Sequence, residues 1–174
     1  MATVLASDAQ LYRLSIRVGE ALIAQDRLLS CAESCTGGWV AKSLTDIVGC
    51  SHWFERGFVT YTNQAKQDML GVEAEVLANH GAVSRDVVEA MAAGALAHSR
   101  ASISLAISGI AGPGGGSDEK PVGLVWFAWA QKRQTGSPEI RSQERIFAGD
   151  REVIRRQAVA YALQGVLTIL HVPA

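Results

Sequence analysis

The stretch LLSCAESCTGG, residues 28–38, joins a short apolar run to two glycines and is followed at once by WVAK. Residues 28–32 are apolar enough for a buried strand, and residues 36–47 repeat apolar side chains at helical spacing. A strand, a tight turn and a helix in this order are typical of α/β proteins. Ligands of such proteins commonly bind where a strand ends, and here that turn carries small hydroxyl residues and glycines.

The rest of the chain predicts helices that alternate with strands, followed by adjacent strands. Ser7 and Gln10 form a capping-box pattern before a helix at 8–25, and Asp150 is placed to cap a final helix. Further helices are expected at 63–70, at 73–80 and after Ser84, and further strands at 57–61, 103–107, 122–130 and 140–147. This order predicts a single α/β domain over residues 1–174, a three-layer α/β/α sandwich with a mixed sheet.

Composition narrows the class of protein. The 174 residues are 48% hydrophobic, and 16 Lys and Arg nearly balance 17 Asp and Glu, so the whole chain offers no electrostatic footprint for nucleic acid. No apolar run approaches the length of a membrane helix and the start lacks a signal-peptide pattern, which predicts a cytoplasmic protein. Three cysteines without a C-x-x-C pair and four scattered histidines predict neither disulfides nor a metal site.

Three residues are candidate nucleophiles, and one lysine is a candidate base. Ser34 lies in the turn, Ser51 follows the next helix, and Cys35 stands at a helix start, a setting that lowers a thiol pKa. Lys66 falls in the first turn of a helix, where desolvation and the helix dipole would depress its pKa and let it activate a serine. The alternatives are a capping role for Ser34 or Thr36, a small buried cysteine, and an ordinary solvated lysine.

Two further segments are candidate anion sites. The loop SGIAGPGGGSDEKPVG, residues 108–123, lacks the spacing of a P-loop and of a dinucleotide fingerprint, but its glycines would let backbone amides approach a ligand. Arg151 and Arg155 stand four residues apart at a helix start, where they could grip a phosphate. The alternatives are a flexible connection and a solvated helix face.

Five blocks of the chain together resemble the family of the C-terminal domain of the competence/damage-inducible protein CinA, in particular its stand-alone amidases. They occur in order and cover nearly the whole chain: AESCTGGWVAK (32–42), WFERGFVTYTNQAK (53–66), HGAVS (80–84), SGIAGPGGGSDEKPVG (108–123) and GDREVIRRQA (149–158). The resemblance implies hydrolysis of the carboxamide of nicotinamide mononucleotide to nicotinate mononucleotide and ammonia. It also implies a homo-oligomer that needs no metal or other cofactor.

The resemblance also implies roles for matching residues. Lys66 matches the family's catalytic lysine, Tyr61 its neighbouring tyrosine, and Ser34 and Ser51 its two motif serines, between which the sequence does not choose. Ser108 stands where many relatives carry threonine. The expected catalytic residues are therefore Ser34, Ser51, Tyr61, Lys66 and Ser108. The expected substrate-binding residues are Thr36, Gly37, Gly38, Gly109, Gly112, Gly114, Arg151 and Arg155, with the N–H groups of residues 36–38 aimed at the oxyanion.

Two other functions remain open at this point. The glycine-rich loop and the family's link to competence proteins allow a catalytically silent nucleotide-binding module that regulates a partner. A hydrolase that uses Cys35 as its nucleophile is the third hypothesis.

Overall fold

The stretch at residues 28–38 forms the strand and turn that its pattern predicts. The computed structural model describes residues 6–172. Strand β1 (Leu29–Glu33) is buried along its whole length and lies between two parallel neighbours. Its side chains alternate between two cores, with Cys31 packed on one face of the sheet and Ala32 on the other. A strand covered on both faces reads as a continuous apolar run, because neither face meets water.

The sheet is mixed, with five strands in the order β2-β1-β3-β4-β5. β1 pairs in parallel with β2 and β3, and β4 and β5 continue the sheet antiparallel. The other strands are β2 (Phe54–Val59), β3 (Ile103–Gly109), β4 (Leu124–Gln131) and β5 (Glu139–Ile146). Glu33 stands opposite Val59 and Ile107, so three strands end side by side at one edge.

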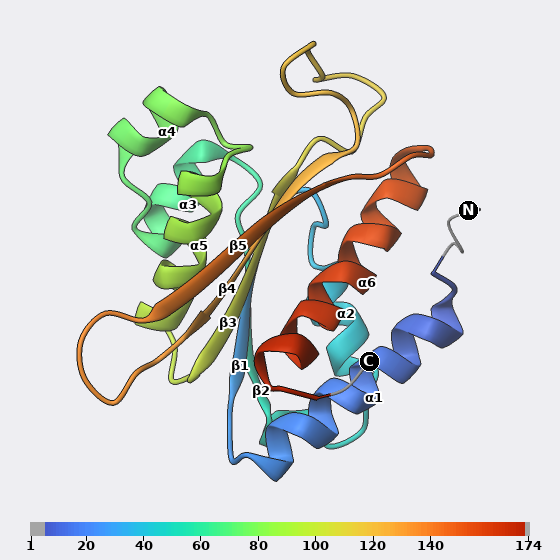
Figure 1. Cartoon of the computed structure of the whole chain (residues 1–174), viewed down its shortest axis with the longest axis vertical. Helices are drawn as coiled ribbons and strands as arrows, with labels where there is room; N and C mark the ends of the chain where they lie inside the picture. The colour runs from blue at the N-terminus through green and yellow to red at the C-terminus, as the bar shows by residue number, and fades with distance from the viewer. Residues whose placement is uncertain (1–5, 173–174) are drawn as a thin grey trace.

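Helices cover both faces of this sheet (Figure 1). One layer holds α1 (Asp8–Ala24), α2 (Trp39–Thr45) and α6 (Arg151–Ile169). The other holds α3 (Asn63–Leu70), α4 (Ala74–His80) and α5 (Arg85–Ala97), and a short 3-10 helix, η1 (Cys50–His52), precedes β2. The predicted three-layer sandwich with a mixed sheet is confirmed.

Most predicted caps are present, and the boundaries that differ have local causes. The capping box of Ser7 and the caps of Ser84 and Asp150 form as predicted. Thr62 caps α3, since its hydroxyl accepts the Ala65 N–H. Helix α2 begins at Trp39, not at residue 36, because the two preceding glycines adopt positive φ angles of 59° and 96°. Within residues 6–172, no helix is long and apolar enough to cross a membrane.

Candidate active site

Ser34 and Lys66 meet at the edge where the three parallel strands end. Ser34 directly follows β1, and its N–H donates to the Ile107 carbonyl of β3 at 3.0 Å. Lys66 lies in the second turn of α3, which returns toward β1 after β2. The distance from Lys66 Nζ to Ser34 Oγ is 3.0 Å. The two residues are 32 positions apart in the chain, and the parallel pairing of β1 and β2 brings them together.

The Lys66 ammonium is withdrawn from water. The residue is fully buried, and Nζ also donates to the Thr60 carbonyl at 2.7 Å. Burial penalises the charged form and lowers the pKa of Lys66 to about 8. A serine hydroxyl beside a lysine that loses its proton near neutrality is the arrangement that a Ser/Lys hydrolase needs.

Cys35 is close to this pair, but its chemistry differs. Its side chain is buried, and burial raises the pKa of the thiol to about 12. The thiol therefore keeps its proton near neutral pH, and a thiol is a much weaker nucleophile than a thiolate. This environment does not favour the hypothesis of a cysteine hydrolase.

A cavity of about 270 Å³ opens at this point. Eight of the expected residues line it: Ser34, Tyr61, Lys66, Ser108, Gly109, Gly112, Gly114 and Arg151. Arg151 joins three segments across the cavity, since it donates to the Gly112 carbonyl and to the Tyr61 hydroxyl, each at 2.7 Å. Arg151, the first residue of α6, is thus held in the cavity lining, where its positive charge can attract an anionic ligand.

The structure does not bring Ser51 to this cavity. Ser51 lies in η1, before β2 begins, whereas Ser34 lies after β1 ends. Because β1 and β2 are parallel, the two serines stand at opposite edges of the sheet. Ser34 is therefore the serine within reach of Lys66, and the sequence could not choose because the choice depends on strand direction.

Four expected binding residues, Thr36, Gly37, Gly38 and Arg155, lie beside the cavity rather than in its lining. Arg155 donates to the carbonyls of Cys35 and Thr36, so its guanidinium is occupied within the protein. Two of the expected oxyanion donors are also occupied, since Gly37 N–H donates to the Ser34 carbonyl and Gly38 N–H to the Glu33 carboxylate. These two N–H groups are not free to bind an oxyanion, which corrects the expectation for Gly37 and Gly38.

Sequence reasoning also missed several residues of the site. Glu33, rather than Ser34 or Thr36, caps α2 with its carboxylate. Ala82 and Val83 line the cavity, and the Ala82 carbonyl accepts a hydrogen bond from Ser108 at 2.7 Å. The block HGAVS contains both residues but gives no chemical signal, because alanine and valine contribute here through their position. Thr60 acts through its carbonyl, which no sequence pattern reveals.

A larger cavity, of about 520 Å³, lies between α1 and α6. Gln10, Arg13, Phe147 and Tyr161 are among the residues that line it. None of its lining residues is a serine, cysteine or lysine, so it offers no counterpart to the pair of Ser34 and Lys66. The smaller cavity is the better candidate for catalysis.

Comparison with known proteins identifies the family of the chain. The family model described as "CinA C-terminal domain" matches residues 11–170. The chain belongs to the CinA C-terminal domain family. A relative from Escherichia coli K12 named "Nicotinamide-nucleotide amidohydrolase PncC" is 58% identical over 158 residues, covering 91% of this chain and 93% of its own. A protein of the same name from Pseudomonas putida is 49% identical over 156 residues, covering 90% and 94%.

Solved structures of CinA proteins share the fold. The crystal structure of the competence/damage inducible protein CihA from Agrobacterium tumefaciens has a TM-score of 0.87 and is 44% identical, covering 97% of this chain and 99% of its own. The family also includes longer proteins. A "CinA-like protein" from Akkermansia muciniphila is 50% identical over 146 residues, which cover 84% of this chain and 34% of the relative.

Proposed function

We propose that this CinA C-terminal domain is an amidohydrolase that converts nicotinamide mononucleotide and water to nicotinate mononucleotide and ammonia. Relatives that bear the name nicotinamide-nucleotide amidohydrolase match the chain over nine-tenths of its length. The observation that carries the proposal is the buried contact of 3.0 Å between Lys66 Nζ and Ser34 Oγ. We assign the activity to one domain spanning the chain.

In the first half of the reaction, neutral Lys66 takes the proton of the Ser34 hydroxyl as Oγ attacks the carboxamide carbon. The resulting lysine ammonium lies beside the developing negative charge and stabilises it. It then gives its proton to the departing nitrogen, and ammonia leaves. Ser34 is left esterified to the nicotinate group.

In the second half, Lys66 is neutral again and takes a proton from a water molecule that attacks the ester carbonyl. The Ser34 oxygen leaves and receives this proton from Lys66, which frees nicotinate mononucleotide. Arg151 and the glycine loop line the same cavity, and we assign them to the phosphate and ribose of the substrate. Tyr61 holds Arg151 in place, and Ser108 fixes the backbone at Ala82.

Ammonia release from nicotinamide mononucleotide tests this assignment. Lys66→Ala should lower kcat by roughly 100-fold to 10,000-fold, the usual contribution of a positioned acid–base group, and Ser34→Ala should lower it at least as much because it removes the nucleophile. Ser51→Ala is the matched control, because Ser51 lies at the opposite sheet edge and should leave kcat unchanged. Wild-type turnover in Lys66→Ala would disprove the dyad.

A nucleotide-binding module without activity is the second candidate. Its support is that CinA-like relatives carry this domain as about a third of a longer chain. Binding of nicotinamide mononucleotide by calorimetry, without ammonia release by the wild type, would favour it. Under either function we expect a small-molecule nucleotide ligand, a homo-oligomer and a cytoplasmic location, with no nucleic-acid partner.

A further inference from the structure

We propose that Glu33 is a positioning residue that holds Ser34 in place for attack. It acts on the Ser34 turn, which is the segment of residues 34–38 between β1 and α2. Glu33 does not line the cavity, so its effect must pass through this turn. The inference rests on the proposed amidase function, and it concerns a residue to which neither the resemblance nor the comparisons give a role.

The Glu33 carboxylate holds the Ser34 turn from the inside. Its Oε2 accepts the N–H groups of Gly38 at 3.1 Å and Val40 at 3.0 Å, and its Oε1 accepts the N–H group of Ala41 at 2.9 Å. The residue is fully buried in β1, where its carbonyl also accepts the Thr60 N–H at 2.8 Å. One side chain therefore ties the end of the strand to the start of the helix.

This arrangement differs from an ordinary helix cap. A cap normally comes from a serine, threonine, asparagine or aspartate directly before the helix, but here that position is Gly38, which has no side chain. Burying a carboxylate costs free energy that a neutral cap would avoid. By reaching across the whole turn, Glu33 fixes both of its ends, which a local cap would not do.

Arg155 holds the same turn from the outside. Its Nε donates to the Cys35 carbonyl at 3.0 Å, and its Nη2 donates to the Thr36 carbonyl at 2.9 Å. The guanidinium also lies over the Trp39 ring, 5.3 Å from its centroid. Within the turn, the Gly38 N–H group is thus bound by the Glu33 carboxylate, and the Cys35 and Thr36 carbonyls are bound by the Arg155 guanidinium.

Glu33→Gln should disturb this geometry with little change in size. The amide keeps one acceptor oxygen, and its NH₂ group would face a backbone N–H, so one of the three hydrogen bonds must be lost. A shift of about 1 Å in a reacting group commonly costs about 100-fold in rate. We expect kcat to fall by about 100-fold while KM changes little, because the cavity residues that bind substrate are unaltered.

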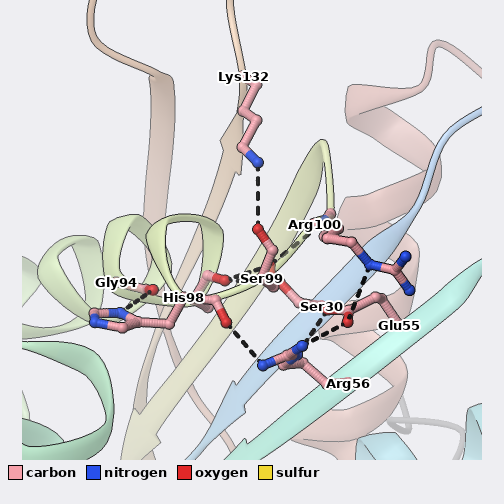
Figure 2. Close-up of polar contacts among 10 residues, drawn as sticks. Ser30, Glu55, Arg56, Gly94, His98, Ser99, Arg100 and Lys132 are labelled. Carbon is pink, nitrogen blue, oxygen red and sulfur yellow. Dashed lines mark hydrogen bonds and ion pairs between the residues drawn. The ribbon is translucent and has the colours of Figure 1, made fainter.

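The chain offers a matched control in Glu55, a carboxylate at the opposite end of the neighbouring strand (Figure 2). Its side chain is only 7% exposed, and it accepts from Arg56 Nε at 2.7 Å and Nη2 at 2.8 Å. Glu55→Gln should lower thermal stability and leave kcat at the wild-type value. This comparison separates the loss of a hydrogen-bonded carboxylate from misplacement of Ser34.

Steady-state ammonia release and the rate at which a fluorophosphonate labels Ser34 should be measured together for wild type, Glu33→Gln, Glu33→Asp, Arg155→Lys and Glu55→Gln. Slow turnover and slow labelling in the variants at Glu33 and Arg155, but not in Glu55→Gln, would support the proposal. Wild-type rates in a folded Glu33→Gln or Glu33→Asp protein would overturn it. A wild type that is labelled at Ser34 but releases no ammonia would instead count against the proposed function, and the labelling rates alone would then decide the role of Glu33.

Discussion

Lys66 determines the pH range in which the proposed dyad works. Only its neutral form can take the Ser34 proton, and burial lowers the pKa of this lysine to about 8. The neutral fraction therefore grows as the pH rises through 8. We predict that kcat/KM for nicotinamide mononucleotide rises with pH and levels off above this value. A pH–rate profile tests this, and a rate that falls across the same range would contradict a lysine base.

The same pKa shift predicts how stability depends on pH. Between pH 8 and 10.5, the unfolded chain holds a proton at Lys66 that the folded protein does not, so folding becomes more favourable as the pH rises. Below pH 8 the folded protein must bury the charged form of Lys66, and the full cost of this burial lowers the unfolding free energy. The unfolding free energy of wild type relative to Lys66→Met should rise by roughly 3 kcal/mol across it, since one pKa unit corresponds to about 1.4 kcal/mol.

Denaturant unfolding of both proteins at several pH values measures this difference directly. The comparison with Lys66→Met cancels the titration of other groups, which both proteins share. A difference that stays constant from pH 8 to 10.5 would show that the lysine keeps an ordinary pKa in the folded state.

The packing of α3 on α5 controls where Lys66 lies. The two helices approach at Gly94, where an added Cβ would lie 2.1 Å from the Leu70 carbonyl oxygen at the end of α3. Alanine usually stabilises a helix interior relative to glycine by about 1 kcal/mol. Here we predict that Gly94→Ala lowers the unfolding free energy by about 1–3 kcal/mol, because α3 must move away.

Thermal or denaturant unfolding checks this prediction. Gly114→Ala is the control for stability, since nothing lies within 4 Å of a Cβ at that position. A Gly94→Ala protein that is as stable as wild type would contradict the prediction, because α3 and α5 would then move apart without loss of unfolding free energy.

The elements show which features the sequence could predict. The sequence predicted the helix caps well, because each capping residue acts on the helix that directly follows it. These residues are Ser7, Ser84 and Asp150. The pairing of Ser34 with Lys66 was predicted only as an alternative, since choosing it over Ser51 requires the direction of β2. The cap from Glu33 could not be predicted, because a carboxylate at the end of a strand becomes a cap only once the chain has turned back over it.

The molecule as a whole separates the candidate site from the charged cluster around Glu55. Ser34 and Lys66 lie at the carboxyl edge of the parallel strands, while Glu55, Arg56 and Arg100 lie at the other edge, with Arg56 bonded to the His98 carbonyl at the end of α5 (Figure 2). Within residues 6–172, no three His, Cys, Asp or Glu side chains gather closely enough to hold a metal ion.

We predict that ammonia release is insensitive to chelators. The proposed reaction takes its nucleophile from Ser34 and its base from Lys66, so dialysis against EDTA should leave kcat unchanged. Loss of activity on dialysis that Zn²⁺ or Mg²⁺ restores would contradict a dyad that acts alone.

The cavity takes its walls from segments that are far apart in the chain: the Ser34 turn, the start of α3, the loop after β3 and the first residue of α6. During synthesis on a ribosome, a growing chain that ends before residue 151 holds both members of the dyad but lacks Arg151 and the Arg155 that braces the turn. If Arg151 binds the substrate phosphate as proposed, such a chain lacks the group that holds the nucleotide. We therefore expect the activity to appear only after the last helix has emerged and docked, so that a stalled or truncated product is inactive rather than partly active.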